Sequence, residues 1–268
     1  MIAGGVLGSP ISHSLSPLLH KTMYEYLGID ATYSAFEVQS GQLQLFLDNE
    51  GSSLNSISLT MPLKEEALLV ADSVSDVARK IQSGNTLSKR DGLWNLASTD
   101  VEGFSHALDS HGRDARGRVL VIGAGATARA VVAACGGVSQ GVTVIHRNPA
   151  RELAIRNSGL NLAMDFIEWD ATIDFNEFDL IVNTTPGETA SIFVDRISNT
   201  SSTFFEVLYN PWPTTILSKW RESGGYGIDG LDLLIHQAIS QVEIFASCSV
   251  DRMQVAKMLR AVGEKALA

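Results

Sequence analysis

Residues 118-RVLVIGAGATARAVVAAC-135 constrain the fold of this chain more than any other stretch. Their first residues form an apolar run typical of a buried strand, which passes through a glycine turn into a long apolar helix. A buried strand followed by a helix is the repeating unit of a parallel sheet that helices cover on both faces. The stretch therefore predicts that an α/β domain begins near Arg118.

The alternation of strands and helices extends over most of the chain. Residues 84–97 indicate a hairpin, because Asp91 and Gly92 form a turn signal between two runs of strand-like residues. Residues 230–248 and 251–268 are helical throughout, and the first of these helices is expected to pack against the N-terminal half. Further strands are predicted at residues 3–8, 31–38, 54–60, 141–146, 179–184 and 203–208. We therefore predict an α/β protein of two α/β domains, comprising residues 1–100 with 231–268 and residues 101–230.

The composition excludes several classes of partner. With 30 acidic and 20 basic residues and a pI near 5.0, the surface is expected to repel phosphate backbones, so no nucleic acid is expected. The N-terminal residues do not resemble a signal peptide, and no apolar run is long enough to span a bilayer, so no membrane partner is expected and the cytoplasm is the predicted location. Cys135 and Cys248 lie in apolar helical contexts that suit buried thiols, and the six histidines show no ligand spacing. No metal site is predicted.

The glycine turn carries a possible cofactor signal. Residues 123-GAGATA-128 fit the pattern G-x-G-x-x-G/A, in which Gly123 makes the turn, Gly125 lets the main chain approach a pyrophosphate, and Ala128 packs closely. The alternative is a tight turn with no ligand. The buried strand before it and the apolar helix after it favour a Rossmann-type, dinucleotide-binding domain.

The end of the next strand indicates which dinucleotide is bound. Residues 145-IHRNPAR-151 supply Arg147 and Arg151 where an NAD enzyme would carry an acid, so a 2′-phosphate and hence NADP is predicted. The alternative is that both arginines are solvated charges at a helix start. Asn183 and Thr184 end a strand beside Pro186 and either line the cofactor groove or form a simple turn. The candidate cofactor-binding residues are Gly123, Ala124, Gly125, Ala126, Thr127, His146, Arg147, Asn148, Arg151, Asn183, Thr184 and Gly230.

The N-terminal string 8-GSPISHSLSPLLH-20 places Ser14 and Ser16 around a turn. Their hydroxyls form a plausible cradle for a small carboxylate. Ser16 can also cap the helix that follows, with Pro17 in its first position and Gly28 at its end.

At these residues the chain resembles the shikimate dehydrogenase family, whose N-terminal signature has this form. The resemblance continues over nearly the whole length. The sequence departs from the family pattern at Ser58 and Ser98, where the family has asparagine, and these shorter side chains affect details of hydroxyl recognition more than the reaction. The matching motifs are 60-TMPLK-64, 84-GNT-86, 99-TDVEG-103, 123-GAGATARA-130, 209-YNPWPT-214 and 230-GLDLLIHQA-238.

The resemblance implies a function and roles for these residues. It implies NADPH-dependent, reversible reduction of 3-dehydroshikimate to shikimate, with Lys64 and Asp100 as the catalytic pair. It also implies a small-molecule substrate bound by residues 1–100 with 231–268, NADP bound by residues 101–230, and an active site in the cleft between these domains. The expected oligomeric state is a monomer or a homodimer. The implied substrate-binding residues are Ser14, Ser16, Thr60, Asn85, Tyr209 and Gln237.

Alternatives stay open for the residues and for the function. Taken alone, Lys64 is interpreted as a solvated charge at the start of a helix. Taken singly, Thr60, Asn85 and Gln237 are interpreted as helix caps or buried hydrogen-bond partners. Tyr209 reaches a substrate carboxylate or only wedges a strand end. The alternative functions are a quinate or aminoshikimate dehydrogenase with the same catalytic pair, and a regulatory NADP-binding protein without turnover.

Overall fold

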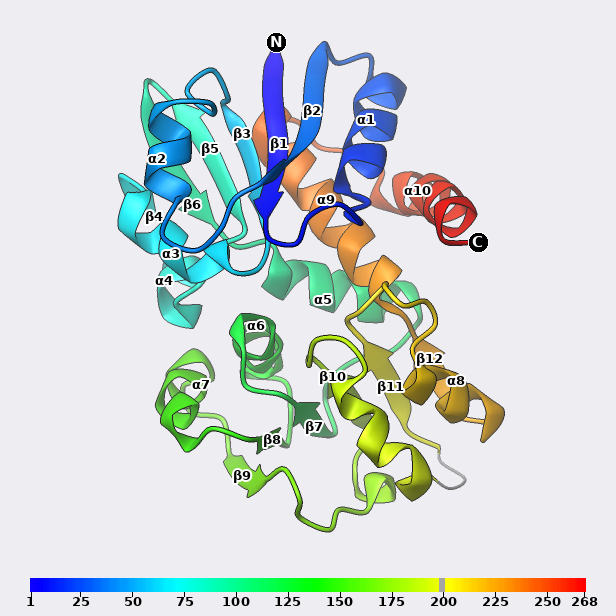
Figure 1. Ribbon diagram of the computed structural model, residues 1–268. Helices are drawn as coiled ribbons and strands as arrows, with labels where there is room; N and C mark the ends of the chain where they lie inside the picture. Colours follow the sequence, from blue (N-terminus) through cyan, green and yellow to red (C-terminus); the bar gives the residue numbers. More distant parts are fainter. Residues whose placement is uncertain (198–200) are drawn as a thin grey trace. The chain divides into compact units, whose positions relative to one another are not determined.

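The computed structural model describes residues 1–197 and 201–268. It divides into two compact units, which are Met1–Gly103 with Leu234–Ala268, and Phe104–Leu233 (Figure 1). The boundaries differ slightly from the predicted ones after residues 100 and 230. Each falls inside a helix, α5 (Asp100–Ser110) or α9 (Gly230–Ala246), because these helices run from one unit into the other. In the described residues, no helix has the length and the apolar composition to cross a membrane.

The first unit alternates strands and helices and ends with the C-terminal helices. Helix α1 packs on β2 and on α10 (Figure 1). Besides parts of α5 and α9, its elements are β1 (Ile2–Gly8), α1 (Ser16–Leu27), β2 (Ala31–Glu37), α2 (Leu43–Asp48), β3 (Ser56–Leu59), α3 (Leu63–Val70), β4 (Ser73–Val74), α4 (Asp76–Ile81), β5 (Thr86–Arg90), β6 (Leu93–Ala97) and α10 (Arg252–Leu267).

The sheet of the first unit is mixed, with the strand order β2-β1-β3-β5-β6-β4. Strand β1 is parallel to both β2 and β3, whereas β5 is antiparallel to β3 and β6. The predicted hairpin is confirmed: Asp91 and Gly92 have φ values of 52° and 81°, which suits a tight turn between twisted antiparallel strands. The sequence did not predict β4, since two residues are too short to show a periodic pattern.

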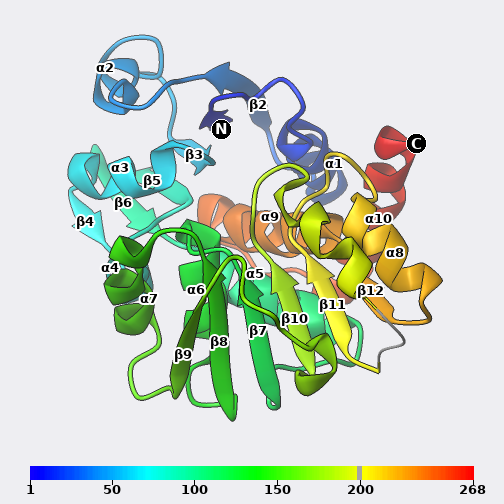
Figure 2. The same ribbon diagram turned by 60° about the horizontal axis from the view of Figure 1, so that its bottom comes forward.

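The second unit has a parallel sheet in the order β9-β8-β7-β10-β11-β12 (Figure 2). Numbered along the chain within this unit, the order is 3-2-1-4-5-6, that of doubly wound dinucleotide-binding folds. The predicted Rossmann-type fold is confirmed. Besides the remaining part of α5, its elements are β7 (Arg118–Ile122), α6 (Ala126–Cys135), β8 (Gly141–His146), η1 (Pro149–Arg151), α7 (Glu152–Ser158), β9 (Met164–Glu168), η2 (Phe175–Glu177), β10 (Leu180–Asn183), η3 (Thr189–Arg196), β11 (Thr203–Glu206), α8 (Thr215–Glu222) and β12 (Tyr226–Ile228).

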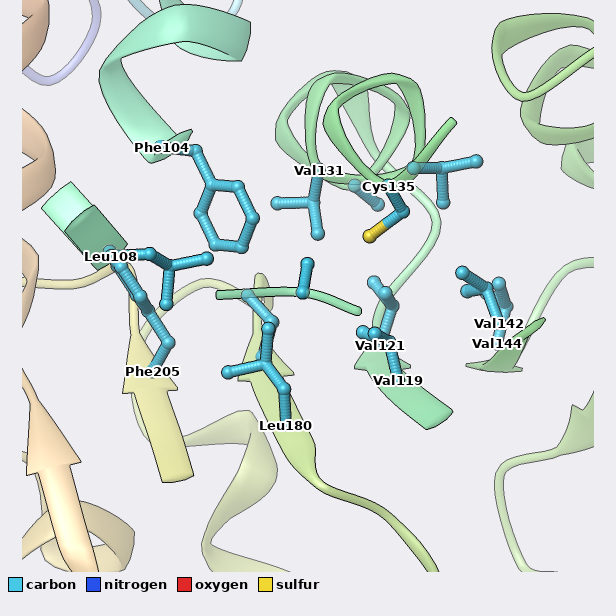
Figure 3. Close-up of a cluster of buried hydrophobic side chains, with 14 of the residues drawn as sticks. Phe104, Leu108, Val119, Val121, Val131, Cys135, Val142, Val144, Leu180 and Phe205 are labelled. Carbon is cyan, nitrogen blue, oxygen red and sulfur yellow. The ribbon is translucent and has the colours of Figure 1, made fainter. Parts of the chain in front are cut away.

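Strand β7 contributes side chains to both faces of this sheet. Val119 and Val121 pack with Val131 and Cys135 of α6 on one face (Figure 3). Leu120 and Ile122 belong to a second buried cluster on the other face. Because successive side chains of a strand alternate between faces, an uninterrupted apolar run requires helical cover on both sides.

The two cysteines differ in their surroundings. Cys135 is buried in α6, as predicted, and burial raises the pKa of its thiol to about 11. Cys248 lies beyond the end of α9 at Ala246 and is only half-buried, so the prediction of a buried helical thiol is wrong for it. The helix that the apolar run predicted up to residue 248 ends two residues earlier, and Ser247 takes a left-handed conformation with φ 51°.

Candidate active site

The candidate substrate residues of the first unit lie at a switch point of its sheet. The chain leaves β1 toward β2 and later enters β3 on the other side of β1. In such sheets the connections diverge at the carboxyl ends of the two neighbouring strands and leave a crevice there, where ligands bind. Ser14 follows β1, and Thr60 and Lys64 follow β3. A Cβ atom on Gly8, the last residue of β1, would lie 2.3 Å from Thr60 Cγ2, so glycine lets the two strand ends meet.

Lys64 and Asp100 form a largely buried ion pair in this unit. Lys64 lies in the first turn of α3, and Asp100 is the first residue of α5. The Lys64 Nζ atom lies 2.7 Å from Asp100 Oδ2, and the two side chains are 15% and 3% exposed. The positive end of the α5 macrodipole also favours a carboxylate at this position. The lysine that the sequence left open as a solvated charge is therefore paired with the aspartate.

The side-chain amide of Asn85 connects Asp100 to Gln237. Its Nδ2 atom donates to Asp100 Oδ1 at 2.9 Å and to Gln237 Oε1 at 3.2 Å. Its Oδ1 atom accepts from the main-chain N–H of Thr99 at 2.8 Å. Because a main-chain N–H can only donate, this contact fixes the orientation of the amide. Asp100 thus receives a donor on each oxygen, from Asn85 on Oδ1 and from Lys64 on Oδ2.

A close approach of two helices brings these residues together. A Cβ atom on Gly103 of α5 would lie 3.0 Å from the main-chain nitrogen of Gln237 in α9 and 3.2 Å from its Cα. Main-chain atoms cannot move aside as the end of a flexible side chain can, so a larger residue would push the helices apart. Gly103 therefore allows Gln237 and Asp100 to reach the same amide of Asn85.

The loop after β1 corrects one prediction about its serines. Ser16 is the first residue of α1, and the preceding cap residue, Leu15, makes no side-chain hydrogen bond. The Ser14 Oγ atom instead accepts a hydrogen bond from the main-chain N–H of Ser16 at 3.3 Å. The prediction that Ser16 caps the helix is wrong, because its own main chain is already helical. Gly28 ends the helix in a left-handed conformation with φ 65°, as predicted.

The glycine turn of the second unit also lies at a switch point, between β7 and β10. Gly123 has φ 110°, and a Cβ atom on it would lie 2.6 Å from Thr184 Oγ1, so both conformation and space require glycine. A Cβ atom on Gly125 would have only Arg151 Nη1 nearby, at 3.9 Å, so this side of the turn is open. Helix α6 begins directly after it at Ala126, and the first N–H groups of a helix lack partners within the helix. The turn is therefore suited to an anion.

The two predicted arginines are exposed and contact different groups of the second unit. The Arg147 guanidinium carbon lies 5.2 Å from the centre of the Trp169 ring. The Arg151 Nη1 atom donates to the carbonyl oxygen of Ala124 in the glycine turn at 3.4 Å. Arg151 is therefore placed beside the turn, whereas Arg147 is held against an aromatic face that the sequence did not single out.

The other two predicted residues of this loop are engaged within the protein. His146 is buried, with Nε2 3.1 Å from Glu152 Oε1 and its ring edge-on to Phe166. The Asn148 Oδ1 atom accepts from the main-chain N–H of Ala150 at 3.0 Å and so caps the turn η1. These contacts hold the main chain of the loop in place. The guanidinium groups of Arg147 and Arg151 remain as its exposed charges.

Asn183 belongs to a buried polar group that supports the turn after β10. Its Nδ2 atom donates to both oxygens of Glu206 at 3.1 and 2.9 Å, and its Oδ1 atom accepts from the N–H and the hydroxyl of Thr185. Thr184 Oγ1 donates to the carbonyl of Ile122 at the end of β7. Asn183 is 1% exposed, so its side chain holds this turn in place, and Thr184 is the residue that meets the glycine turn.

Burial raises the pKa of the Glu206 carboxyl to about 7, although donors from Asn183, Leu208 and Thr214 counteract this effect. Between pH 4.5, which is the ordinary pKa of a glutamate, and about pH 7, Glu206 keeps a proton in the folded protein that it has lost in the unfolded chain. The free energy of unfolding therefore falls as pH rises through this window, by about 3 kcal/mol for this group.

We expect the Glu206→Gln variant to lack this part of the pH dependence, since glutamine stays uncharged. Urea unfolding at several pH values between 4.5 and 7 measures it, with Glu177→Gln as a control because Glu177 is an exposed glutamate of the same unit. Equal slopes of unfolding free energy against pH in wild type and Glu206→Gln would contradict the assignment.

Two predicted residues lie near the end of the second unit. Tyr209 follows β11 and is half-buried. It belongs to the second unit, whereas the other candidate substrate residues belong to the first. A Cβ atom on Gly230 would lie 2.4 Å from the carbonyl carbon of Leu208 and from the carbonyl oxygen of Val207. The glycine is thus required by main-chain contact at the start of α9.

Sequence reasoning missed a buried polar cluster of the first unit. It connects α1, α9 and three strands, and burial lowers the pKa of its histidine, His20, to about 3, so that ring is neutral. Lone polar residues inside apolar patterns are the only sequence signal for such a group. We call it the Gln241 cluster; its members are His20, Tyr33, Ser58, Thr86 and Gln241.

The chain is similar to known proteins over most of its length. Residues 6–87 match the family model described as the shikimate dehydrogenase substrate binding domain. The shikimate dehydrogenase (NADP(+)) of Leptospira interrogans is 30% identical over 94% of this chain and 92% of its own length. The crystal structure of Mycobacterium tuberculosis shikimate dehydrogenase has a TM-score of 0.88 at 33% identity, covering 97% of this chain and 100% of that one. Shikimate 5-dehydrogenase of Thermus thermophilus, in complex with NADP(H) and shikimate, has a TM-score of 0.84 at 28% identity, covering 98% and 100%. This chain belongs to the shikimate dehydrogenase family.

Proposed function

We propose that this protein is an NADP-dependent shikimate dehydrogenase, which reduces the 3-keto group of 3-dehydroshikimate to shikimate and catalyses the reverse reaction. The observation that carries the proposal is the Lys64–Asp100 pair with its 2.7 Å contact and the Asn85 amide on the second carboxylate oxygen. Reduction of a ketone requires a proton donor at the oxygen atom that becomes a hydroxyl. The family to which the chain belongs indicates that this ketone is 3-dehydroshikimate.

Lys64 is the residue proposed to hold the proton. Its Nζ atom carries the proton to be given to the substrate oxygen, and it recovers that proton from the hydroxyl in the reverse direction. Asp100 holds the ammonium group in place through Oδ2 and orients it toward the substrate. Because Asn85 also donates to Asp100, the carboxylate cannot rotate freely. The pair is therefore preorganised before substrate binds.

The second unit is proposed to bind NADP, and its residues fit that group. The open side of Gly125, the start of α6 and the switch point between β7 and β10 together suit a pyrophosphate. The exposed guanidinium groups of Arg147 and Arg151 suit a 2′-phosphate. When bound, NADPH supplies the hydride. The first unit, which contains the matched residues 6–87, is proposed to bind the substrate.

Ser14 and Ser16 are proposed to hold the ring carboxylate. We expect Ser14→Ala and Ser16→Ala each to raise KM for shikimate about tenfold, with little change in KM for NADP, because hydrogen bonds to charged groups contribute about 1.5–3 kcal/mol. Steady-state kinetics measures this effect. Ser9→Ala is the matched control, since Ser9 lies in the same loop but bonds to Glu37. If a methyl ester of shikimate binds the wild type as well as the acid does, the carboxylate is held elsewhere.

The experiment that tests the proposed function follows the absorbance of reduced nicotinamide with the purified protein. Shikimate and NADP are expected to support turnover, with quinate and an aminoshikimate analogue as competing substrates and NAD as the competing cofactor. A higher kcat/KM for quinate or the amino analogue would reassign the substrate. NADP binding without turnover on any of these substrates would identify a regulatory protein instead.

A further inference from the structure

The side chain of Gln241 forms four hydrogen bonds within the first unit. The residue is 4% exposed and lies in α9. Its Oε1 atom accepts from Ser58 Oγ at 2.8 Å and from His20 Nε2 at 3.2 Å. Its Nε2 atom donates to the carbonyl oxygen of Asn85 at 3.0 Å and to Thr86 Oγ1 at 3.3 Å. Both acceptor sites and both donors of the carboxamide are used, so its position is fixed.

The acceptor side of Gln241 is held by rigid neighbours. The His20 ring stacks on Tyr33 with a centroid distance of 4.0 Å and an interplanar angle of 10°. Tyr33 Oη donates to Ser58 Oγ at 2.6 Å, so the Ser58 hydroxyl has its own hydrogen directed at Gln241. These contacts determine which end of the Gln241 carboxamide faces Asn85.

The donor side of Gln241 reaches Asn85 by two routes. One is the direct bond to the Asn85 carbonyl, which also accepts from the main-chain N–H of Leu59 in β3. The other passes through Thr86, whose Oγ1 accepts from Gln241 and then donates to Asn85 Oδ1 at 2.8 Å. Both the main chain and the side-chain amide of Asn85 are therefore held from α9.

We propose that Gln241 is a positioning residue for the catalytic pair: it holds Asn85 through these two routes, and Asn85 holds the Asp100 carboxylate against Lys64. The inference rests on the proposed function. Gln241 lies 156 residues from Asn85 in the sequence and touches neither Lys64 nor Asp100 through any bond described above. A small displacement of a reacting group lowers turnover more than it lowers ground-state binding, so the effect belongs in kcat.

The test uses the full-length protein and the Gln241→Met variant, which keeps the length of the side chain and removes its hydrogen bonds. We expect kcat for shikimate oxidation to fall about tenfold, while KM for NADP stays unchanged. Ser240→Ala is the matched control: Ser240 is a buried residue of the same helix that accepts a hydrogen bond from Arg252 at 2.9 Å, so this variant loses a comparable bond away from Asn85. It is expected to keep the wild-type kcat.

A rescue variant separates positioning from general stability. Ser58 Oγ lies 2.8 Å from the Gln241 carboxamide, so an asparagine at residue 58 carries a carboxamide into the space that Gln241→Ala leaves. We expect Gln241→Ala alone to lose turnover and Gln241→Ala with Ser58→Asn to recover most of it. Thr86→Val is the second probe, because it breaks only the side-chain route to Asn85; a roughly threefold loss in kcat is expected.

The outcomes distinguish this inference from the proposed function. If the wild type turns over none of the substrates, the proposed function is wrong, and the NMR signals of the Asn85 side-chain amide still test the positioning role. Those signals are expected to move in Gln241→Met and to return in the rescue variant. The inference is overturned if Gln241→Met has the wild-type kcat. If the wild type shows no turnover, the inference is overturned when the Asn85 side-chain signals do not move in Gln241→Met. Should Gln241→Met not fold, the same readouts on Thr86→Val decide the question.

Discussion

Replacing Lys64 with alanine or Asp100 with asparagine is expected to lower kcat at least about a hundredfold, which corresponds to about 2.7 kcal/mol of transition-state stabilisation. Lys64 carries the proton that the substrate oxygen takes up, and Asp100 holds the ammonium group through the 2.7 Å contact. Because both act on the transition state, KM and Kd for NADP are expected to change little. The measurement is steady-state kinetics with shikimate and NADP, together with NADP binding by titration.

The double variant tests whether the two residues act as one unit. If they do, Lys64→Ala with Asp100→Asn is expected to be little slower than the slower single variant. Once the Lys64 ammonium group is gone, the Asp100 carboxylate has nothing to hold in place, so its loss adds little. Asp76→Asn is the matched control for a lost helix N-terminal charge, since Asp76 is the first residue of α4 as Asp100 is of α5. Additive losses, or near-normal turnover of Lys64→Ala, would remove the lysine from the chemistry.

The second large effect is expected in the choice between NADP and NAD. The wild type is expected to prefer NADP at least tenfold in kcat/KM, and Arg147→Ala is expected to lose most of that preference. A planar guanidinium binds phosphate oxygens through two parallel hydrogen bonds, each worth about 1.5–3 kcal/mol when charged. Arg147 is exposed and stacked on Trp169, so its guanidinium is oriented without being paired to an acid in any contact described above.

Arg151 is expected to have a smaller and different effect. Its guanidinium contacts the Ala124 carbonyl in the glycine turn, so Arg151→Ala is expected to weaken binding of both cofactors and to reduce the preference less than Arg147→Ala. Arg156→Ala is the control for net charge, because Arg156 lies in the neighbouring helix over the Phe166 ring. Equal losses with NADP and NAD in Arg147→Ala, or a wild type that prefers NAD, would show that this loop does not read the 2′-phosphate.

The sequence alone was enough to predict the glycine turn and its surroundings. Strand β7, the turn and helix α6 are contiguous, so the apolar run, the two glycines and the apolar helix describe the whole unit. The Asp91–Gly92 hairpin was predictable for the same reason. Strands β9 and β12 were missed, because few of their side chains are fully buried and their apolar pattern is therefore weak.

The pairing of the active-site residues was determined by the sequence only in part. The motifs around Lys64, Asn85 and Asp100 named the residues, but not that Asn85 donates to one carboxylate oxygen while Lys64 donates to the other. That arrangement depends on the order of β1, β3 and β5 and on the approach of α5 to α9 at Gly103. Strand order and helix contacts join residues far apart in the chain, and hydrophobic periodicity contains no information about them.

The tertiary structure also decided which polar residues face inward. Asn183 was a candidate for the cofactor groove and is bonded to Glu206, while Gln241 had no predicted role and forms four buried hydrogen bonds. A polar side chain removed from water must find partners, and those partners are chosen by whatever the fold places beside it. The sequence determined the local elements and the reactive residue types, because these depend on neighbours in the chain. The structure decided the orientation of the reactive groups, because that depends on contacts such as the one between Ser58 and Gln241, which lie 183 residues apart.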